Sequence, residues 1–343
     1  MQSQATCYQN INMKHPPSIA DVPGIEIGHA QDDAALTGCT VILCRKGAVA
    51  GVDVRGGAPG TRETDLLAPL NLVQKVHAVL LAGGSAFGLD AAGGVMKYLE
   101  EQKIGFNTGI AKVPIVPAAI LFDLNLGDKR IRPDAEMGYK ACLAASKAAP
   151  AEGNAGAGTG ASVGKMFGAA LAMKSGIGSV SLDVGGGIVI GAIVAVNAWG
   201  DVIEDGKIIA GLRSGKVGPL RVGGKNYFAD TQEMMKKPVG RGILGFASRA
   251  NTVIGVVVTN ARLTKTEATK VAQMAHDGVA RSIRPAHTML DGDTMFALST
   301  GNKKSDTTPI GAFAAEAVSQ AIVRAVKMSA PAGGLPGINN STR

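Results

Sequence analysis

Paired acidic residues form the first pattern in this sequence that could do chemistry. Asp291 and Asp293 stand two residues apart in the segment D-G-D-T. Two neighbouring carboxyl groups can act as an acid and a base, or can hold a charged group through hydrogen bonds. The further ligands of an EF-hand calcium loop do not follow them, which excludes that site and leaves a simple turn as the alternative. Spacing alone does not decide between these two interpretations.

A serine on a predicted turn forms the second pattern. Ser85 lies in the segment G-G-S-A-F-G, directly after an apolar run, and so resembles the nucleophile elbow of the α/β-hydrolases. His287 and several aspartates follow it in the order of a Ser–Asp–His triad. The elbow requires a glycine two residues after the serine, however, and Phe87 stands there. We therefore favour a turn whose glycines let the following helix pack closely, with the triad as the alternative.

The glycine-rich segment 156–165 invites comparison with nucleotide-binding loops. A P-loop requires a glycine where Thr159 stands and a serine or threonine where Met166 stands. The dinucleotide fingerprint requires a preceding strand, and no strand pattern precedes residue 156. Neither the histidines nor the four cysteines have a metal-ligand spacing, and no C-x-x-C pair is present. We therefore predict no cofactor and no metal ion.

Composition excludes several classes of protein. The chain has 343 residues, of which 46% are hydrophobic and only 18% charged, and this favours a folded globular protein. Aromatic residues make up 4%, which leaves little material for stacking on nucleic-acid bases. The net charge of +8 is concentrated in residues 204–249, where nine lysines and arginines face four acidic residues. Because glycines and aliphatic residues separate these charges, we predict a solvated insertion and no nucleic-acid partner.

The apolar runs of the sequence also indicate where the protein is located. No apolar run approaches the ~20 residues of a membrane span, and the first residues lack the apolar core of a signal peptide. We therefore expect no membrane partner and a cytoplasmic location. The four cysteines are expected to be buried and reduced.

The predicted elements that must position the polar residues are short apolar strands and amphipathic helices. Three strands are expected within residues 37–44, 48–57 and 77–84, followed by a turn and a helix in 85–102. Two further apolar runs, 188–197 and 252–260, have the character of strands and flank the basic insertion. The polar pair Asn251-Thr252 stands at the start of the second run, where residue types alone indicate an ordinary strand start.

Two helices are predicted in the last quarter of the chain. Thr264 and Glu267 form a capping box, so a helix is expected to begin there and to end before Pro285. A final apolar helix is expected over residues 310–328. Strands and helices are thus mixed throughout, and the fold class is α/β or α+β.

Beyond these patterns, nearly the whole chain resembles a family of self-processing aminopeptidases. This family includes the L-aminopeptidase/D-esterases, the β-peptidyl aminopeptidases, a pantetheine hydrolase and the nylon-oligomer hydrolase. The resemblance covers about residues 21–330. It rests on motifs in the right order, namely DVPGIEIGH, TGCTVIL, DVRGGAPGTRETDLL, LAGGSAFGLDAAGGVM, IRPDAEMGY, GAGTGASVGK, GAIVAVNAWG, NTVIGVVVTNARLT and HTMLDGDTMFALSTG.

The resemblance implies a fold and a maturation step. The fold would be the four-layer αββα sandwich that the family shares with ornithine acetyltransferase, built as one domain over 21–330 after an N-terminal tail, 1–20. The precursor would cut itself between Asn251 and Thr252, into an α chain of residues 1–251 and a β chain of residues 252–343. Cleavage would free the α-amine of Thr252. A free α-amine has a pKa near 7.7–8.0, so it can act as the base for the hydroxyl of the same residue.

The resemblance also implies roles for individual residues. Thr252 would be the nucleophile of both self-cleavage and catalysis, and Asp291 and Asp293 would hold its α-amine and orient its hydroxyl. Asn197 would donate its amide to the tetrahedral oxyanion. Lys165 would assist proton removal or bind an oxyanion, and an exposed surface lysine is the alternative.

The remaining expected site residues line the substrate cleft. The cleft would be lined by Phe122, Gly84 and Ser85. Ser85 would then belong to a turn and would not be the nucleophile. Phe122 departs from the family pattern, because some relatives carry a tyrosine in its place and a phenyl ring cannot donate a hydrogen bond. A role that needs that hydroxyl therefore does not carry over to this chain.

The implied activity is hydrolysis of N-terminal residues from short peptides, or of small amides or esters, through an acyl-enzyme. Tetramers of αβ units are expected, as in the relatives. One alternative is acyl transfer to an amine, as in ornithine acetyltransferase. Another is a scaffold of the same fold that never cleaves.

Overall fold

The computed structural model describes residues 16–244 and 251–339. Half of the described strands belong to one nine-stranded sheet, in which β1 (Glu26–Asp32) pairs with β2. The other strands follow, in spatial order, as β10 (Ile177–Asp183), β11 (Val189–Asn197), β16 (Thr252–Ala261), β18 (Thr294–Lys303), β2 (Thr37–Val54), β4 (Val76–Ala82), β7 (Ala118–Ile120) and β3 (Thr61–Arg62).

Strand β2 belongs to both halves of this sheet. Its first part pairs with β1 and β4, and its last part, from Val49 to Val54, pairs with β18. The register against β4 shifts between Leu43 and Ala48, and Gly47 has a φ of +75° within that shift. The sequence predicted two strands, 37–44 and 48–57. One bulged strand replaces them, because a bulge absorbs the extra residues and bends the chain without a loop.

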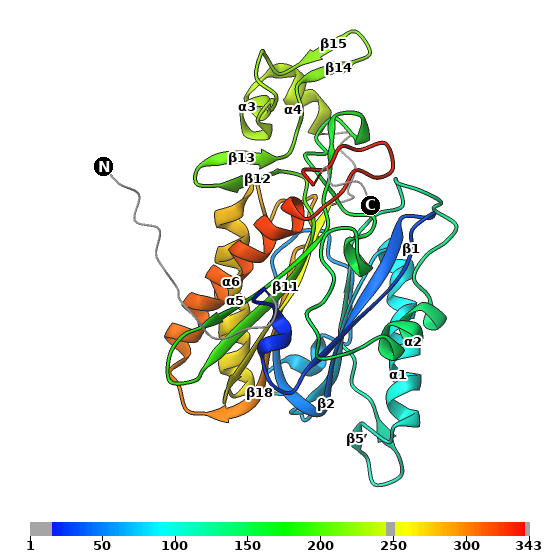
Figure 1. Ribbon diagram of the computed structural model, residues 1–343, viewed down its shortest axis with the longest axis vertical. Helices are drawn as coiled ribbons and strands as arrows, with labels where there is room; N and C mark the ends of the chain where they lie inside the picture. Colours follow the sequence, from blue (N-terminus) through cyan, green and yellow to red (C-terminus); the bar gives the residue numbers. More distant parts are fainter. Residues whose placement is uncertain (1–15, 245–250, 340–343) are drawn as a thin grey trace.

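Four helices cover the two outer faces of the folded sheet. Helices α5 (Lys265–Ser282) and α6 (Thr307–Lys327) pack on the half that contains β11 and β16, whereas α1 (Ala91–Glu101) and α2 (Ala135–Leu143) pack on the half that contains β4 (Figure 1). A third apolar core lies between the halves, where Leu81 of one and Val256 of the other are buried. The layers therefore follow the order αββα, which confirms the expected sandwich.

Local sequence signals account for several helix boundaries. The Thr264 Oγ1 accepts from the Glu267 amide, and the Glu267 carboxylate accepts from the Thr264 amide at 2.7 Å, so the predicted capping box is present. Helix α5 ends at Ser282, before Pro285, as expected. Helix α1 begins later than predicted because a 3-10 helix, Ser85–Asp90, precedes it.

The basic insertion is more ordered than the sequence suggested. An arm at one end of the sandwich contains β12 (Asp201–Glu204), β13 (Lys207–Ala210), β14 (Gly215–Val217), β15 (Leu220–Val222), α3 (Thr231–Lys236) and α4 (Pro238–Leu244) (Figure 1). Met234 of this arm packs against Trp199 and Met166 in a small separate core. The insertion is therefore ordered, and its basic side chains are solvated as predicted, since Lys207, Lys216, Lys225 and Arg241 are exposed. Residues 245–249 of it lie outside the described residues.

The remaining elements are short. They are β5 (Phe106–Asn107), β6 (Lys112–Val113), β8 (Ser162–Val163), β9 (Met173–Lys174) and β17 (Ile283–Arg284). Ile19 and Leu335 are buried, so the packed region extends past residues 21–330 at both ends. Among the described helices, none combines the length and the apolar character needed to cross a membrane. Cys39, Cys44 and Cys142 are buried free thiols as predicted, whereas Cys7 lies outside the described residues.

Candidate active site

Thr252 is buried at the start of the central strand β16. It is 3% exposed and lies opposite Asn197 in the antiparallel pairing of β11 with β16. Its Oγ1 donates a hydrogen bond to the carbonyl oxygen of Asn251, the residue before it. The hydroxyl therefore lies beside the carbonyl group of the 251–252 peptide bond. A hydroxyl in this position is a candidate nucleophile toward that carbonyl.

The same carbonyl oxygen accepts a second hydrogen bond from the turn between the two acidic residues. The Gly292 amide donates to the Asn251 oxygen at 2.9 Å. A Cβ atom on Gly292 would lie 2.7 Å from the Ala58 carbonyl oxygen and 2.9 Å from the Thr252 Oγ1. Only glycine therefore fits this close approach. A backbone amide aimed at a carbonyl oxygen stabilises negative charge that develops there.

The two predicted carboxylates flank Gly292 and face different partners. Asp293 accepts from the Val253 amide through Oδ1 at 2.8 Å and from the His287 Nδ1 through Oδ2 at 2.8 Å. Asp291 accepts through Oδ2 from the amide of Thr288 at 2.9 Å and from its hydroxyl at 2.6 Å. Both acids are buried. The turn therefore brings both acids to the start of β16. The D-G-D segment is a buried turn whose carboxylates have defined hydrogen-bond partners.

Two groups at the site have pKa values near neutrality. Burial, together with the charge of Asp293, raises the pKa of Asp291 to about 6. Burial lowers the pKa of the Lys165 ammonium to about 7, although Asp291, Asp123 and Asp293 oppose this effect. An acid and an amine of this kind can exchange protons at neutral pH.

Lys165 is buried, and its side chain is hydrogen-bonded to Asn197, the residue opposite Thr252. Its Nζ donates to the Asn197 carbonyl oxygen at 2.8 Å and to the Asn197 Oδ1 at 2.7 Å. The alternative of an exposed surface lysine is therefore wrong, since Lys165 is 6% exposed. The Asn197 Oδ1 also accepts from the Ser162 amide, and the Nδ2 donates to the Phe122 carbonyl oxygen at 2.8 Å. The structure thus joins Lys165, Asn197 and Phe122 in one network.

The same network continues to the turn that holds Ser85. Asp123, next to Phe122, accepts from the Gly84 amide at 2.7 Å, and the Ser85 amide donates to the Leu121 carbonyl oxygen at 3.0 Å. Phe122 enters the network through its backbone, so the hydroxyl that it lacks is not required for this contact. Substrate contact by Phe122, Gly84 and Ser85 stays a prediction.

The alternative of a triad built on Ser85 is not formed. The His287 ring binds Asp293 and stands edge-on to the His276 ring, and no hydrogen bond joins Ser85 to His287 in the described residues. Ser85 has a φ of +56° and Gly84 a φ of +81°, which produces the tight turn before the 3-10 helix. The preferred interpretation of this segment as a close turn is confirmed.

Sequence reasoning missed several residues of this site. Gly292, Thr288 and Asp123 were not singled out, and His287 was considered only as a partner of Ser85. A usable signal was present, because His287 and Thr288 precede Asp291 within one short segment, H-T-M-L-D. No group of three histidine, cysteine or acidic side chains in the described parts of the chain is arranged to hold a metal ion.

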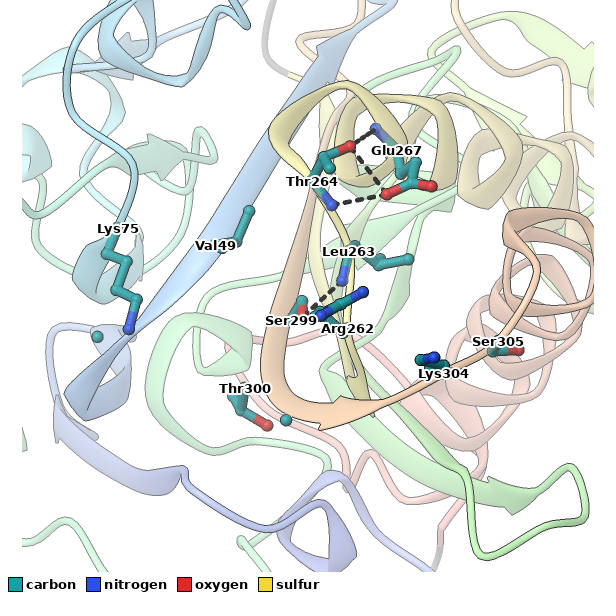
Figure 2. A pocket seen from close by; sticks show the side chains of 12 residues that line it. Val49, Lys75, Arg262, Leu263, Thr264, Glu267, Ser299, Thr300, Lys304 and Ser305 are labelled. Atoms are coloured by element: carbon teal, nitrogen blue, oxygen red, sulfur yellow. Dashed lines mark hydrogen bonds between the residues drawn. The ribbon is translucent and has the colours of Figure 1, made fainter.

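A separate cavity of about 680 Å³ lies at the other end of β16 (Figure 2). Residues 262–264, which directly follow this strand, line it together with Lys75 and Lys304. None of the predicted site residues is part of its lining. This cavity therefore does not belong to the site around Thr252.

The fold and the site together are those of an amide hydrolase that carries a hydroxyl at a strand start, and comparison with known proteins agrees. Residues 17–339 match the family model described as Peptidase family S58. The chain is 42% identical to an uncharacterized aminopeptidase of Mycobacterium leprae, over 93% of this chain and 92% of that protein. It is 32% identical to a 6-aminohexanoate-oligomer endohydrolase of Paenarthrobacter ureafaciens, over 90% and 85% of the two chains. The chain belongs to this peptidase family and is a hydrolase.

Solved structures of similar fold extend the comparison. The L-aminopeptidase D-Ala-esterase/amidase from Ochrobactrum anthropi superposes with a TM-score of 0.68 at 19% identity, over 96% of this chain and 91% of that chain. A β-aminopeptidase from Burkholderia sp. superposes with a TM-score of 0.64 at 23% identity, over 96% and 94%. These likenesses confirm the fold expected from the resemblance.

Proposed function

We propose that this protein cuts itself between Asn251 and Thr252 and then works as an N-terminal-nucleophile hydrolase. The observation that carries the proposal is the hydrogen-bonded triplet of the Thr252 hydroxyl, the Asn251 carbonyl and the Gly292 amide. It combines a nucleophile with a donor on the oxygen that becomes negative. The family membership of the chain supports the same reaction class.

In the self-cleavage step, Thr252 Oγ1 attacks the Asn251 carbonyl carbon and gives its proton to a base. The Gly292 amide stabilises the resulting oxyanion. The C–N bond then breaks, the proton goes to the departing Thr252 nitrogen, and an ester joins Asn251 to Oγ1. Water hydrolyses this ester and leaves a free α-amine on Thr252. Lys165 and Asp291 are the groups that can carry the proton, because their pKa values lie near neutrality.

In the mature enzyme, the freed α-amine takes the hydroxyl proton while Oγ1 attacks the substrate carbonyl. The first product leaves and an acyl-enzyme remains on Thr252, which water then hydrolyses. Asp291 and Asp293 hold the α-ammonium, and the Asn197 side-chain amide donates to the oxyanion. The substrates are N-terminal residues of short peptides, or small amides and esters.

Intact-mass spectrometry of the wild type beside a Thr252→Ala variant tests the first step. Self-cleavage yields fragments of about 25 and 9 kDa, in proportion to the 251 and 92 residues of a 34.8 kDa chain. The smaller fragment begins at Thr252, and the variant stays intact. Two intact chains would contradict the proposal and favour a non-cleaving scaffold.

A substrate panel tests the second step on the cleaved protein. It contains p-nitroanilides of L-alanine, D-alanine and β-alanine, and 6-aminohexanoate oligomers, each with and without a free amine acceptor. Release of free acid supports hydrolysis, whereas accumulation of acylated acceptor favours the acyltransferase alternative. The proposal includes a cytoplasmic location and assembly into tetramers of αβ units, and sedimentation velocity of the mature protein checks the assembly.

A further inference from the structure

A half-buried histidine holds one of the two acidic residues. His287 donates to Asp293 Oδ2 twice, from its backbone amide at 3.0 Å and from its ring Nδ1 at 2.8 Å. The other oxygen of Asp293 accepts from the amide of Val253, the residue directly after Thr252. Asp293 is 1% exposed. His287 therefore acts on one side of a carboxylate whose other side fixes the backbone beside the nucleophile.

The surroundings of His287 favour its charged form. The Nδ1 carries a proton because it faces a carboxylate oxygen that already accepts a backbone amide. The ring centroids of His287 and His276 are 4.8 Å apart at an interplanar angle of 77°. The second ring nitrogen, Nε2, is buried without a hydrogen-bond partner in the described residues, which opposes a charge on the ring, so the charged form depends on the two bonds to Asp293. The His276 Nε2 lies 3.0 Å from the Asp53 carbonyl oxygen and so carries the proton of a neutral ring.

We propose that His287 is a positioning residue that holds Asp293 through two hydrogen bonds, and that Asp291 is the member of the acidic pair that binds and releases a proton. The two acids differ in the way this requires. Asp293 pairs with the His287 ring, whereas the hydrogen bonds that Asp291 accepts from described residues come from the neutral amide and hydroxyl of Thr288. Two carboxylates in one buried turn raise the pKa of each other, so a group that hydrogen-bonds to one of them also affects the proton affinity of its neighbour.

The direction of the pKa shifts agrees with this division of roles. Burial lowers the pKa of His287, but its contacts with Asp293 outweigh this and raise the pKa above the ordinary value. Burial and the charge of Asp293 raise the pKa of Asp291 to about 6. Burial lowers the pKa of His276 to about 4, which keeps that ring neutral.

Other charged groups also act on His287 and Asp291. The charge of Arg55, in the segment after β2, lowers the pKa of His287. Arg55 itself forms an ion pair with Asp53, at the end of β2, with an N–O distance of 2.7 Å. On the other side of the pair, Lys165 lowers the pKa of Asp291. Of the groups that face His287, only Asp293 makes a direct ion pair with its ring, at 2.8 Å, in the described part of the chain.

This inference rests on the proposed function for its kinetic test only. His287→Asn keeps a side-chain amide donor for Asp293 and tolerates the φ of +56° at this position, but it removes the charge. Without the cation, the acidic pair and the α-ammonium of Thr252 that it holds both keep their protons to higher pH. The acid limb of kcat/KM for the mature enzyme should therefore move up by about one pH unit. An unmoved limb in a folded, cleaved variant would overturn the proposal.

A matched histidine serves as the control. His77 is buried, and its Nδ1 accepts from the Ile115 amide at 3.1 Å, but no carboxylate of the described residues pairs with it. Burial lowers its pKa, so its charge does not contribute at neutral pH. His77→Asn should therefore leave the acid limb where it is in the wild type. An equal shift in both variants would show a general effect of the substitution and contradict the assignment.

A second measurement needs no activity. In the full-length Thr252→Ala variant, the NMR signals of the His287 ring should titrate above the pH typical of a free histidine. Adding Asp293→Asn should lower that midpoint by at least one pH unit, because the carboxylate is its main stabilising partner. A midpoint that does not respond to Asp293→Asn would refute the pairing. Because this test involves no cleavage, it stays decisive even where Thr252 proves not to be the nucleophile.

Discussion

Asn197 and Thr252 lie opposite each other in the antiparallel pairing of β11 with β16, one as the last residue of its strand and the other as the first. The Lys165 Nζ donates to both oxygens of Asn197 and is thereby held at the end of β11, the strand that pairs with β16 at Thr252. The D-G-D turn approaches from the other side through the Gly292 amide. The site is therefore assembled around one residue pair of the central sheet.

Gly292→Ala should slow self-cleavage at least tenfold. The added methyl group would meet the Ala58 carbonyl oxygen and the Thr252 Oγ1, and it would push the amide away from the Asn251 oxygen. One oxyanion donor is worth about 10²–10³ in rate, and a displaced donor loses a part of that. The rate is measured by the decay of the intact chain after synthesis. Gly93→Ala is the control, because a Cβ there meets nothing within 4 Å.

Asn197→Ala should reduce both self-cleavage and kcat by about 10²–10³, the usual effect of removing an oxyanion donor. It also removes the Oδ1 acceptor of Lys165. Asn260→Ala tests whether any asparagine that joins these strands has this effect. Asn260 accepts from the Val189 amide and donates to Gly187 at the far end of the same strand pair. Comparable losses of rate in both variants would argue against a catalytic role for Asn197.

Asp291→Asn should prevent efficient self-cleavage and yet stabilise the fold at neutral pH. The folded-state pKa of about 6 lies above the ordinary 3.8, so the wild-type carboxyl favours folding below about pH 4 and loses that contribution as pH rises through 6. Relative to Thr252→Ala alone, the double variant should gain about 2 kcal/mol of unfolding free energy at pH 7.5. The gain should vanish near pH 3.5.

Urea unfolding of the intact chain at both pH values measures this difference. Asp183→Asn, at an exposed carboxylate on the end of β10, is the control and should change neither quantity. A stability gain that is the same at pH 3.5 and pH 7.5 would contradict the link to the ionisation of Asp291.

Lys174→Met should destabilise the chain by about 3 kcal/mol, as expected when a buried donor that satisfies several carbonyl acceptors is removed and those acceptors stay unsatisfied. The Nζ of Lys174 donates to the carbonyl oxygens of Gly158, Ala161 and Ser175, and the residue is fully buried. These carbonyls belong to the segment that leads to Lys165 and to the strand after it. Thermal unfolding of the Thr252→Ala background gives the measurement. Lys140→Met, at an exposed pair with Glu136, should stay within about 0.5 kcal/mol.

Local patterns in the sequence predicted the elements that carry the site. The apolar run 252–260 corresponds to β16, and the capping box at Thr264 and Glu267 starts α5, because both signals depend only on neighbouring residues. The order of the family motifs also identified Thr252 and the two acids as one group. Both results use information that is contiguous along the chain.

Tertiary structure alone decided the contacts between distant segments. The Gly292 amide reaches the Asn251 oxygen, and the His287 ring reaches His276 of α5, only because β18 lies parallel to β16. The single strand β2 could not be read from its residues either, since a bulge and a loop have the same composition at Gly47. Burial then sets the pKa values of Lys165 and Asp291, and burial depends on everything packed around a residue rather than on its neighbours in sequence.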